Sequence, residues 1–303
     1  MVNYLILFNF IFFLATILSG GFTVSNLLRL GAKYGPLIAY GEWQRLVICI
    51  FLHGNLWHLL FNSYALYQLG HLVEGIFGQR KFLGIYFLCG LSGSVFSYFL
   101  NYQQVGVGAS GAIFGLAGAL FAGGMKHRNT PLNRLALNIL PFIIINLVIG
   151  LAVPTIDNAA HIGGLLCGML LGWLLPVGVS WRRWQKTVEE IAYWLTILFV
   201  GFSFLSFFTP FFGWRTTASL DDVVVFHNAF QGFLLRIENG QQVRPEEVSR
   251  LVAPDGRARS LQEKLLRFLS GSGGIALWQE IRSEFLEWRE DVLKRYRGLI
   301  YER

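Results

Sequence analysis

The sequence predicts an all-α protein in two parts, a polytopic bundle of membrane helices followed by a small soluble helical domain. Three observations lead to this fold class. Charged residues make up only 14 % of the 303 residues, against about 25 % in an average globular protein. Residues 1–212 contain 11 Lys/Arg and 5 Asp/Glu, whereas residues 213–303 contain 14 and 13. The first part also contains seven long apolar stretches, which argues against a single soluble domain or a disordered chain.

The apolar stretches predict the order of the membrane helices. The first has no basic residue ahead of it, so we expect a retained helix rather than a cleaved signal peptide. Residues 46–52 are apolar but too few to cross a bilayer, which needs about 20 residues, and we assign them to a long first loop. The predicted spans are 3–19, 56–76, 82–100, 110–125, 135–152, 159–175 and 191–212.

These spans divide the chain into three regions. Residues 1–180 are the predicted membrane core, residues 181–212 a linker with the seventh helix, and residues 213–303 the soluble tail. In the tail, apolar residues at helical spacing alternate with charged ones, which favours a helical bundle around its own core over a dedicated partner-binding surface. The predicted tail helices are 221–240, 245–252, 260–270 and 275–301, with a glycine-rich hinge at 271–274.

Basic residues predict the orientation in the membrane. Eight of the eleven Lys/Arg in residues 1–212 lie in the connections after the second, fourth and sixth spans, so these connections face the cytoplasm. This distribution explains the net charge of +7 without a nucleic-acid partner. We therefore expect a multi-pass integral protein of the bacterial cell (inner) membrane, with the lipid bilayer as its surroundings.

Unusual polar residues lie near the outer ends of the even-numbered spans: His58 and Asn62 on the second, Ser110 on the fourth, and His161 on the sixth. From Ser110 to Lys126 the helix rises about 24 Å, which is less than the hydrocarbon thickness of about 30 Å. Ser110 is thus expected below the outer surface, with the other polar residues at a similar depth. These residues converge on one site that opens to the outer face.

Ser110 lies in a run of small residues with Gly108 and Gly111 on either side. Taken alone, such a short motif favours a packing role, because small residues let membrane helices approach closely and serine bonds to its own backbone. The alternative is a nucleophile at a loop-to-helix junction. The flanking glycines then allow an irregular backbone, and the N–H at the helix start stabilises an oxyanion.

Gly164, Gly168 and Gly172 form a stripe of small residues that repeats every four positions, and His161 falls on or near the same stripe. Such a stripe packs closely against a neighbouring helix, and packing against the fourth span brings the imidazole within reach of Ser110. An ionisable side chain within a span is costly, so a functional role is the default hypothesis over a structural one. Asp157 is better placed as a helix N-cap than as a third catalytic residue, and we expect a Ser-His dyad.

His58 and Asn62 share one helical face because they are four residues apart. His53 and His58 raise the possibility of a zinc site, but no acidic ligand is nearby, so we expect no metal and no cofactor. An amide and an imidazole N–H suit donation to a developing negative charge. We expect a structural role for His53. Residues 42–45 are expected to shape the first loop at the interface, through Trp anchoring and an Arg–carboxylate or Arg–carbonyl contact.

Together these motifs resemble the rhomboid family of intramembrane serine proteases. The resemblance covers about residues 1–212 and is specific because the motifs occur in the family's order on the second, fourth and sixth spans. The tail at 213–303 matches no element of the family. The motifs are Glu-Trp-Gln-Arg at 42–45, His58-x-x-x-Asn62 preceded by His53, Gly108-Ala109-Ser110-Gly111, and Ala160-His161 followed by Gly164 and Gly168.

The resemblance implies a rhomboid-like six-helix core with an additional seventh helix. It also implies that Ser110 is the nucleophile and His161 the general base, with His58 and Asn62 completing the oxyanion hole beside the Ser110 N–H. Phe114 matches a position where the family carries a ring stacked on the histidine. The implied substrates are membrane proteins with weak transmembrane helices.

Two other function classes compete with this interpretation. A catalytically inactive relative would act as a membrane-protein binder or chaperone, but such relatives generally lack the nucleophile or the base. A channel or transporter would need polar residues through the whole membrane depth or inverted repeats. Here the polar cluster is confined to one end of the spans, so the sequence favours the protease.

Overall fold

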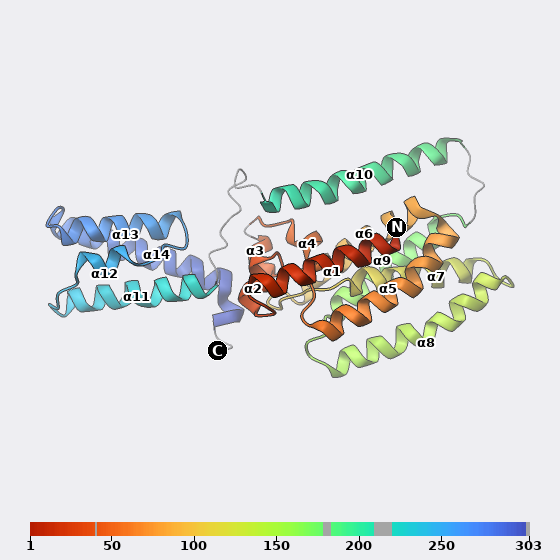
Figure 1. Ribbon diagram of the computed structural model, residues 1–303, viewed down its shortest axis with the longest axis horizontal. Helices are drawn as coiled ribbons and strands as arrows, with labels where there is room; N and C mark the ends of the chain where they lie inside the picture. The colour runs from red at the N-terminus through yellow and green to blue at the C-terminus, as the bar shows by residue number, and fades with distance from the viewer. Residues whose placement is uncertain (40, 178–182, 209–219, 301–303) are drawn as a thin grey trace. The chain divides into compact units, whose positions relative to one another are not determined.

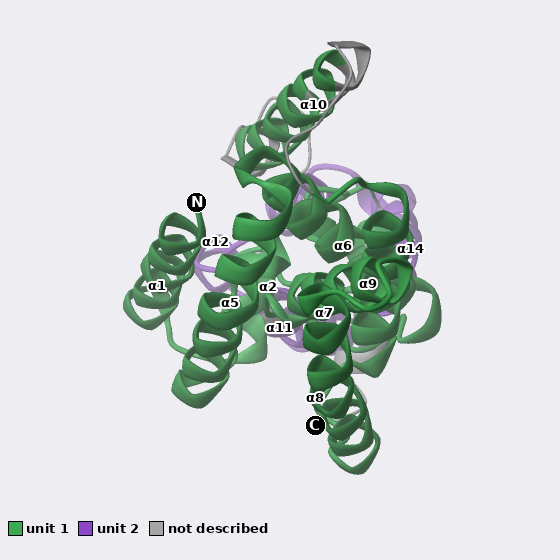
Figure 2. Cartoon of the chain, turned by 90° about the vertical axis from the view of Figure 1, so that its right-hand side faces the viewer, with its two compact units in different colours: residues 1–209 green, residues 210–303 purple. Residues whose placement is uncertain are grey.

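A computed structural model describes residues 1–39, 41–177, 183–208 and 220–300 of the chain. It divides into two compact units, Met1–Thr209 and Pro210–Arg303, coloured separately in Figure 2. Within the described residues every named element is a helix, with one isolated β-bridge between Lys33 and Gly106. The all-α prediction is confirmed. The boundaries expected after residues 180 and 212 lie outside the described residues.

The first unit contains a helix at each of the seven predicted spans (Figure 1). Thr130 caps the helix that follows the fourth span, since its side chain accepts from the Asn133 N–H. The observed ends lie within four residues of the predicted ones, with two exceptions at the seventh span: the helix there begins eight residues before the predicted start at 191, and the predicted end at 212 lies outside the described residues. The helices are α1 Val2–Ser19, α5 Leu56–Phe77, α6 Gln79–Leu100, α7 Ser110–Lys126, α8 Pro131–Ala152, α9 Asn158–Leu174 and α10 Arg183–Phe208.

The first loop folds into short helices around a buried arginine. Arg45 Nε lies 2.6 Å from Glu42 Oε2, and Arg45 Nη1 donates to the carbonyls of Leu28 and Ala32 at 2.7 and 2.9 Å. Both predicted kinds of arginine contact, to carboxylate and to carbonyl, are therefore present. The loop helices are α2 Val24–Arg29, α3 Gly35–Ala39, α4 Arg45–Ile48 and the 3₁₀ helix η1 Cys49–Phe51.

Membrane crossing is not equally evident for all seven helices. Among the described residues, α1, α6 and α8 are each long and apolar enough to span, and Arg45–Phe51 with α5 forms a fourth candidate bent by 93°. Helices α7 and α9 have only 17 residues each, and the apolar stretch within α10 is Glu190–Leu205. The chain is an integral membrane protein, and its central helices are shorter than the bilayer, as the expected depth of Ser110 requires.

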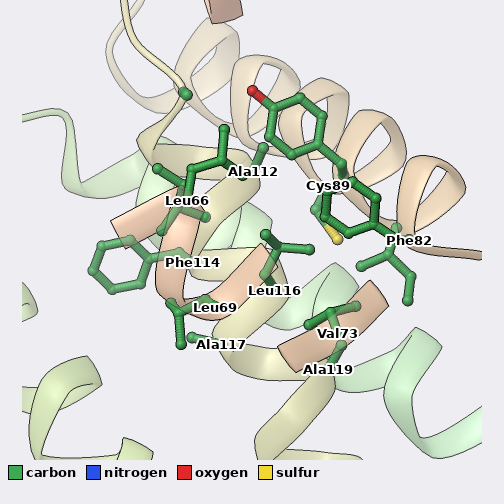
Figure 3. Close-up of a cluster of buried hydrophobic side chains, with 14 of the residues drawn as sticks. Leu66, Leu69, Val73, Phe82, Cys89, Ala112, Phe114, Leu116, Ala117 and Ala119 are labelled. Carbon is green, nitrogen blue, oxygen red and sulfur yellow. The ribbon is translucent and has the colours of Figure 1, made fainter. Parts of the chain in front are cut away.

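Helix α7 lies at the centre of the first unit and contacts α5, α6, α8 and α9 (Figure 2). Buried side chains of three helices meet along it: Leu66 and Leu69 from α5, Phe82 and Cys89 from α6, and Leu116 from α7 itself (Figure 3). The residues at both ends of α7 are thereby held from several sides.

The closest helix contact joins α7 to α9 and depends on glycine. A Cβ atom added to any of the three repeat glycines of α9 would overlap a backbone oxygen of α7, so only glycine fits there. This confirms the predicted small-residue packing between the fourth and sixth spans. The overlapping pairs are Gly164 with Gly111, Gly168 with Gly115, and Gly172 with Ala119.

The second unit forms its own aromatic core, as predicted. Phe226 and Phe230 of its first helix pack against Phe285 and Trp288 of its last, with ring centroids 5.1–5.3 Å apart. The third helix begins earlier than expected because Asp255 caps it. The helices are α11 Leu220–Glu238, α12 Pro245–Ser249, α13 Gly256–Leu269 and α14 Gly274–Ile300.

The glycine contact predicts a large stability difference between two Gly→Ala variants. In Gly168→Ala the new Cβ overlaps the Gly115 oxygen, and overpacking of this kind costs about 1–3 kcal/mol. Gly201→Ala in α10 is the matched control, because nothing lies within 4 Å of its Cβ position. We expect a lower thermal unfolding temperature in detergent for Gly168→Ala alone. Equal unfolding temperatures would contradict the close packing.

Candidate active site

Ser110 and His161 face each other across the α7–α9 contact. Ser110 is the first residue of α7, and His161 lies in the first turn of α9. His161 Nε2 lies 2.9 Å from Ser110 Oγ, which is hydrogen-bonding distance. The His161 side chain is buried, with 7 % of its surface exposed. The structure therefore brings the two predicted residues together as a nucleophile–base pair requires.

The plane of the His161 ring is set by Phe114, one turn along α7. The two ring centroids are 4.2 Å apart and the planes differ by 14°, so the rings are stacked. Nδ1 of His161 has no hydrogen-bond partner among the described residues. The Asp157 carboxylate instead caps α9 by accepting from the Ala160 N–H at 3.2 Å. Ser110 and His161 thus form a hydrogen-bonded pair, and Asp157 has the N-cap position expected of it.

Gly108 positions the chain that enters α7. Its φ of 122° is in the region that favours glycine, and its N–H donates to the Cys49 carbonyl at 2.9 Å. A Cβ atom here would lie 2.7 Å from His58 Nε2 and 3.8 Å from Asn62 Nδ2. His58 and Asn62 therefore line the space beside the segment that leads into Ser110.

The hydrogen bonds of His58 and Asn62 leave donors directed at this space. The Gly54 N–H donates to His58 Nδ1 at 3.4 Å, which places the ring proton on Nε2, the atom near Gly108. Asn62 Nδ2 donates one hydrogen to the His58 carbonyl at 2.9 Å and keeps a second. Both side chains can thus donate to a negatively charged oxygen next to Ser110.

His53 contacts this pair without reaching Ser110. Its ring centroid lies 5.2 Å from that of His58, and Nδ1 lies 3.2 Å from the Phe51 carbonyl. Packing against His58 agrees with the structural role predicted for His53. Among the described residues, no group of three or more His, Cys, Asp or Glu side chains is arranged to hold a metal ion.

A cavity of about 30 Å³ lies beside Ser110 and has several polar side chains in its lining, and this volume is enough for water. The outer connection contributes Gly106–Gly108 to the lining, while its Gln104 donates to the Pro154 carbonyl. Four further lining residues on other elements were not predicted from the sequence. These are Lys33, Cys49, Ser94 and Ser97.

Comparison with known proteins identifies similar sequences. A family profile for the rhomboid domain matches residues 40–177, which include all the predicted site residues. Rhomboid protease GluP of Bacillus subtilis (strain 168) is 39 % identical over 199 residues, 66 % of this chain and 39 % of that protein. RHOMBOID-like protein 5 of Arabidopsis thaliana is 37 % identical over 159 residues, 51 % of each chain.

A third relative is Rhomboid protease AarA of Providencia stuartii, which is 34 % identical over 172 residues. That match covers 48 % of this chain and 61 % of the relative. The chain therefore spans between 39 % and 61 % of the length of these three relatives.

The geometry at Gly108 predicts that a methyl group there reduces the reactivity of Ser110. In Gly108→Ala the Cβ clashes with the His58 ring and the backbone is strained at positive φ. We expect labelling of Ser110 by a fluorophosphonate to slow by at least about tenfold, since small misplacements cost large factors in rate. Gly240→Ala, also at positive φ but with nothing within 4 Å, is the control and keeps wild-type labelling. Equal labelling of both variants would contradict this role of Gly108.

Proposed function

Because the chain belongs to the rhomboid family, we propose that it is an intramembrane serine endopeptidase that hydrolyses peptide bonds in or near transmembrane helices of membrane proteins. The observation that carries the proposal is the 2.9 Å contact between Ser110 Oγ and His161 Nε2. A serine hydroxyl is a weak nucleophile, and an adjacent imidazole activates it by accepting its proton.

The proposed reaction proceeds through an acyl-enzyme. Ser110 Oγ attacks the scissile carbonyl while His161 Nε2 takes the hydroxyl proton and then transfers it to the leaving amine. His161 next removes a proton from water, which attacks the ester; as the bond from the carbonyl carbon to Ser110 Oγ breaks, His161 returns the proton to Ser110 Oγ and the second product leaves. Stacking on Phe114 keeps the imidazole plane in place through both steps.

Three donors surround the position where negative charge develops. They are the Ser110 N–H at the start of α7, the His58 Nε2–H and the Asn62 amide. The N-terminus of α7 adds its positive dipole end. Fixed donors in a water-poor site stabilise an oxyanion more than they stabilise the neutral carbonyl, and this difference lowers the barrier.

Glycines hold the two helices of the dyad at the spacing that the reaction needs. A Cβ at Gly111 would lie 3.2 Å from the Ala160 carbonyl, and one at Gly164 would overlap the Gly111 oxygen. Side chains at these positions would move α9, and His161 with it. Gly108, Gly111 and Gly164 therefore support the dyad but take no part in the reaction.

We further propose that the site opens to the outer face of a bacterial inner membrane. Arg80, Lys126 and Arg134 lie at the opposite ends of their helices from the dyad, where the positive-inside rule puts the cytoplasm. A helical substrate exposes its carbonyls to Ser110 only after local unwinding. The proposed substrates are therefore membrane proteins whose helices are weak near the outer boundary.

Removal of either dyad residue tests the function. Ser110→Ala and His161→Ala should abolish cleavage of a single-span substrate with a weak helix, because neither nucleophile nor base is replaced. Ser92→Ala, which loses a 2.9 Å bond from α6 to the Gly163 carbonyl of α9, is the control and should remain active. Mass spectrometry of the products measures cleavage. Turnover by Ser110→Ala, or a wild-type protein that neither cleaves nor reacts with fluorophosphonate, would refute the protease.

Removal of one oxyanion donor should reduce the activity without abolishing it. Asn62→Ala and His58→Ala should each lower kcat by about 10²–10³-fold, the usual effect of losing one such donor. KM should change little, because the donors act mainly on charge that forms in the transition state. Steady-state kinetics on the same substrate measures both constants. Wild-type kcat in both variants would show that the donors lie elsewhere.

A further inference from the structure

Lys33 is a lysine buried in the first loop, with 1 % of its surface exposed. Its ammonium donates to three backbone carbonyls, those of Ser97 at 3.3 Å, Asn101 at 2.8 Å and Gln104 at 2.9 Å. These carbonyls lie at the end of α6 and the start of the connection that leads to Ser110. A cation in this position satisfies helix-terminal carbonyls that would otherwise be unpaired.

At the start of α9, Asp157 is the negatively charged counterpart of Lys33 and accepts hydrogen bonds from three donors. Its carboxylate accepts from the Ser97 hydroxyl, from Asn101 Nδ2 at 2.7 Å and from the Ala160 N–H at 3.2 Å. An anion at a helix N-terminus is favourable for the same electrostatic reason that a cation suits a C-terminus. Ser97 and Asn101 are thus held by both charged residues.

The two side chains meet at Gly106. The backbones of Lys33 and Gly106 exchange two hydrogen bonds of 2.9 Å each. A Cβ on Gly106 would lie 3.3 Å from Lys33 Cε and 3.4 Å from Asp157 Oδ2, so the glycine is enclosed by the pair. Burial lowers the pKa of the Lys33 ammonium, and the charge of Asp157 opposes this shift.

We propose that Lys33 and Asp157 form a clamp on residues 101–109 and are positioning residues for the dyad. The side chains of the clamp bond to neighbours of the dyad rather than to Ser110 or His161. Lys33 and Gly106 fix the connection four residues before Ser110, while Asp157 fixes the helix turn that carries His161. A relative shift of about 1 Å between reacting groups can cost about 10²-fold in rate.

This inference rests on the proposed protease function, and its test uses the full chain in detergent. The variants are Lys33→Met, Asp157→Asn and the double variant. Lys126→Met is one control, because Lys126 Nζ also donates to a helix carbonyl, that of Trp173, at the other end of α7. Asp255→Asn is the other, since Asp255 likewise caps a helix, in the second unit.

We expect kcat to fall by about 10- to 100-fold in each clamp variant while KM changes by less than about twofold. Amide hydrogen exchange in residues 101–109 should become faster. The kcat of the double variant should lie within about twofold of the lower of the two single-variant kcat values, because both residues act on one segment. Both controls should retain wild-type kcat and exchange.

Two results would overturn the clamp: wild-type kcat with unchanged exchange at 101–109, or a loss of activity that follows a lower unfolding temperature with no change in exchange. If Lys33→Met does not fold, Asp157→Asn decides alone, because it keeps the side-chain shape. If the wild-type protein neither cleaves nor reacts with fluorophosphonate, the protease proposal fails separately. The exchange measurement then still supports the clamp or overturns it.

Discussion

The close approach of the α7 and α9 backbones is the constraint on which the site depends. In lipid, helices gain little from burying apolar side chains against each other, so packing between small residues provides most of the association energy. Gly164 and Gly168 bring α9 against the carbonyls of Gly111 and Gly115. Any side chain at these glycines would separate the helices. The 2.9 Å contact between Ser110 and His161 exists only at this spacing.

The chain that precedes Ser110 creates a second requirement, because it is irregular and its backbone groups have no partners within a helix. Backbone groups there must be paired within the protein, since the bilayer offers no partners. The first loop supplies many of these partners: the Cys49 carbonyl accepts from Gly108, and Lys33 donates to carbonyls at the end of α6. Arg45 holds that loop together in turn. The loop is therefore part of the site's construction and not only a connection.

Periodicity made much of this predictable from the sequence. Apolar runs located the seven helices, and the four-residue glycine repeat placed His161 opposite Ser110. Lys33 was missed because its partners are backbone carbonyls, which carry no residue identity and leave no sequence pattern. The other residues that line the cavity were missed for a related reason. Asn101 and Gln104 find partners on α9 and just before it, and such non-local bonds cannot be deduced from a polar loop composition.

The separation of Asp157 from His161 has a physical explanation in this setting. A carboxylate bonded to the imidazole would carry its charge into apolar surroundings, where desolvation is costly unless several donors compensate. One turn earlier, Asp157 has those donors: a hydroxyl, an amide, a backbone N–H and the nearby positive charge of Lys33. Phe114 meanwhile orients the His161 ring without any charge. Phe114 thus orients the histidine, as the aspartate of a serine-protease triad does, while Asp157 holds the start of the helix that carries it.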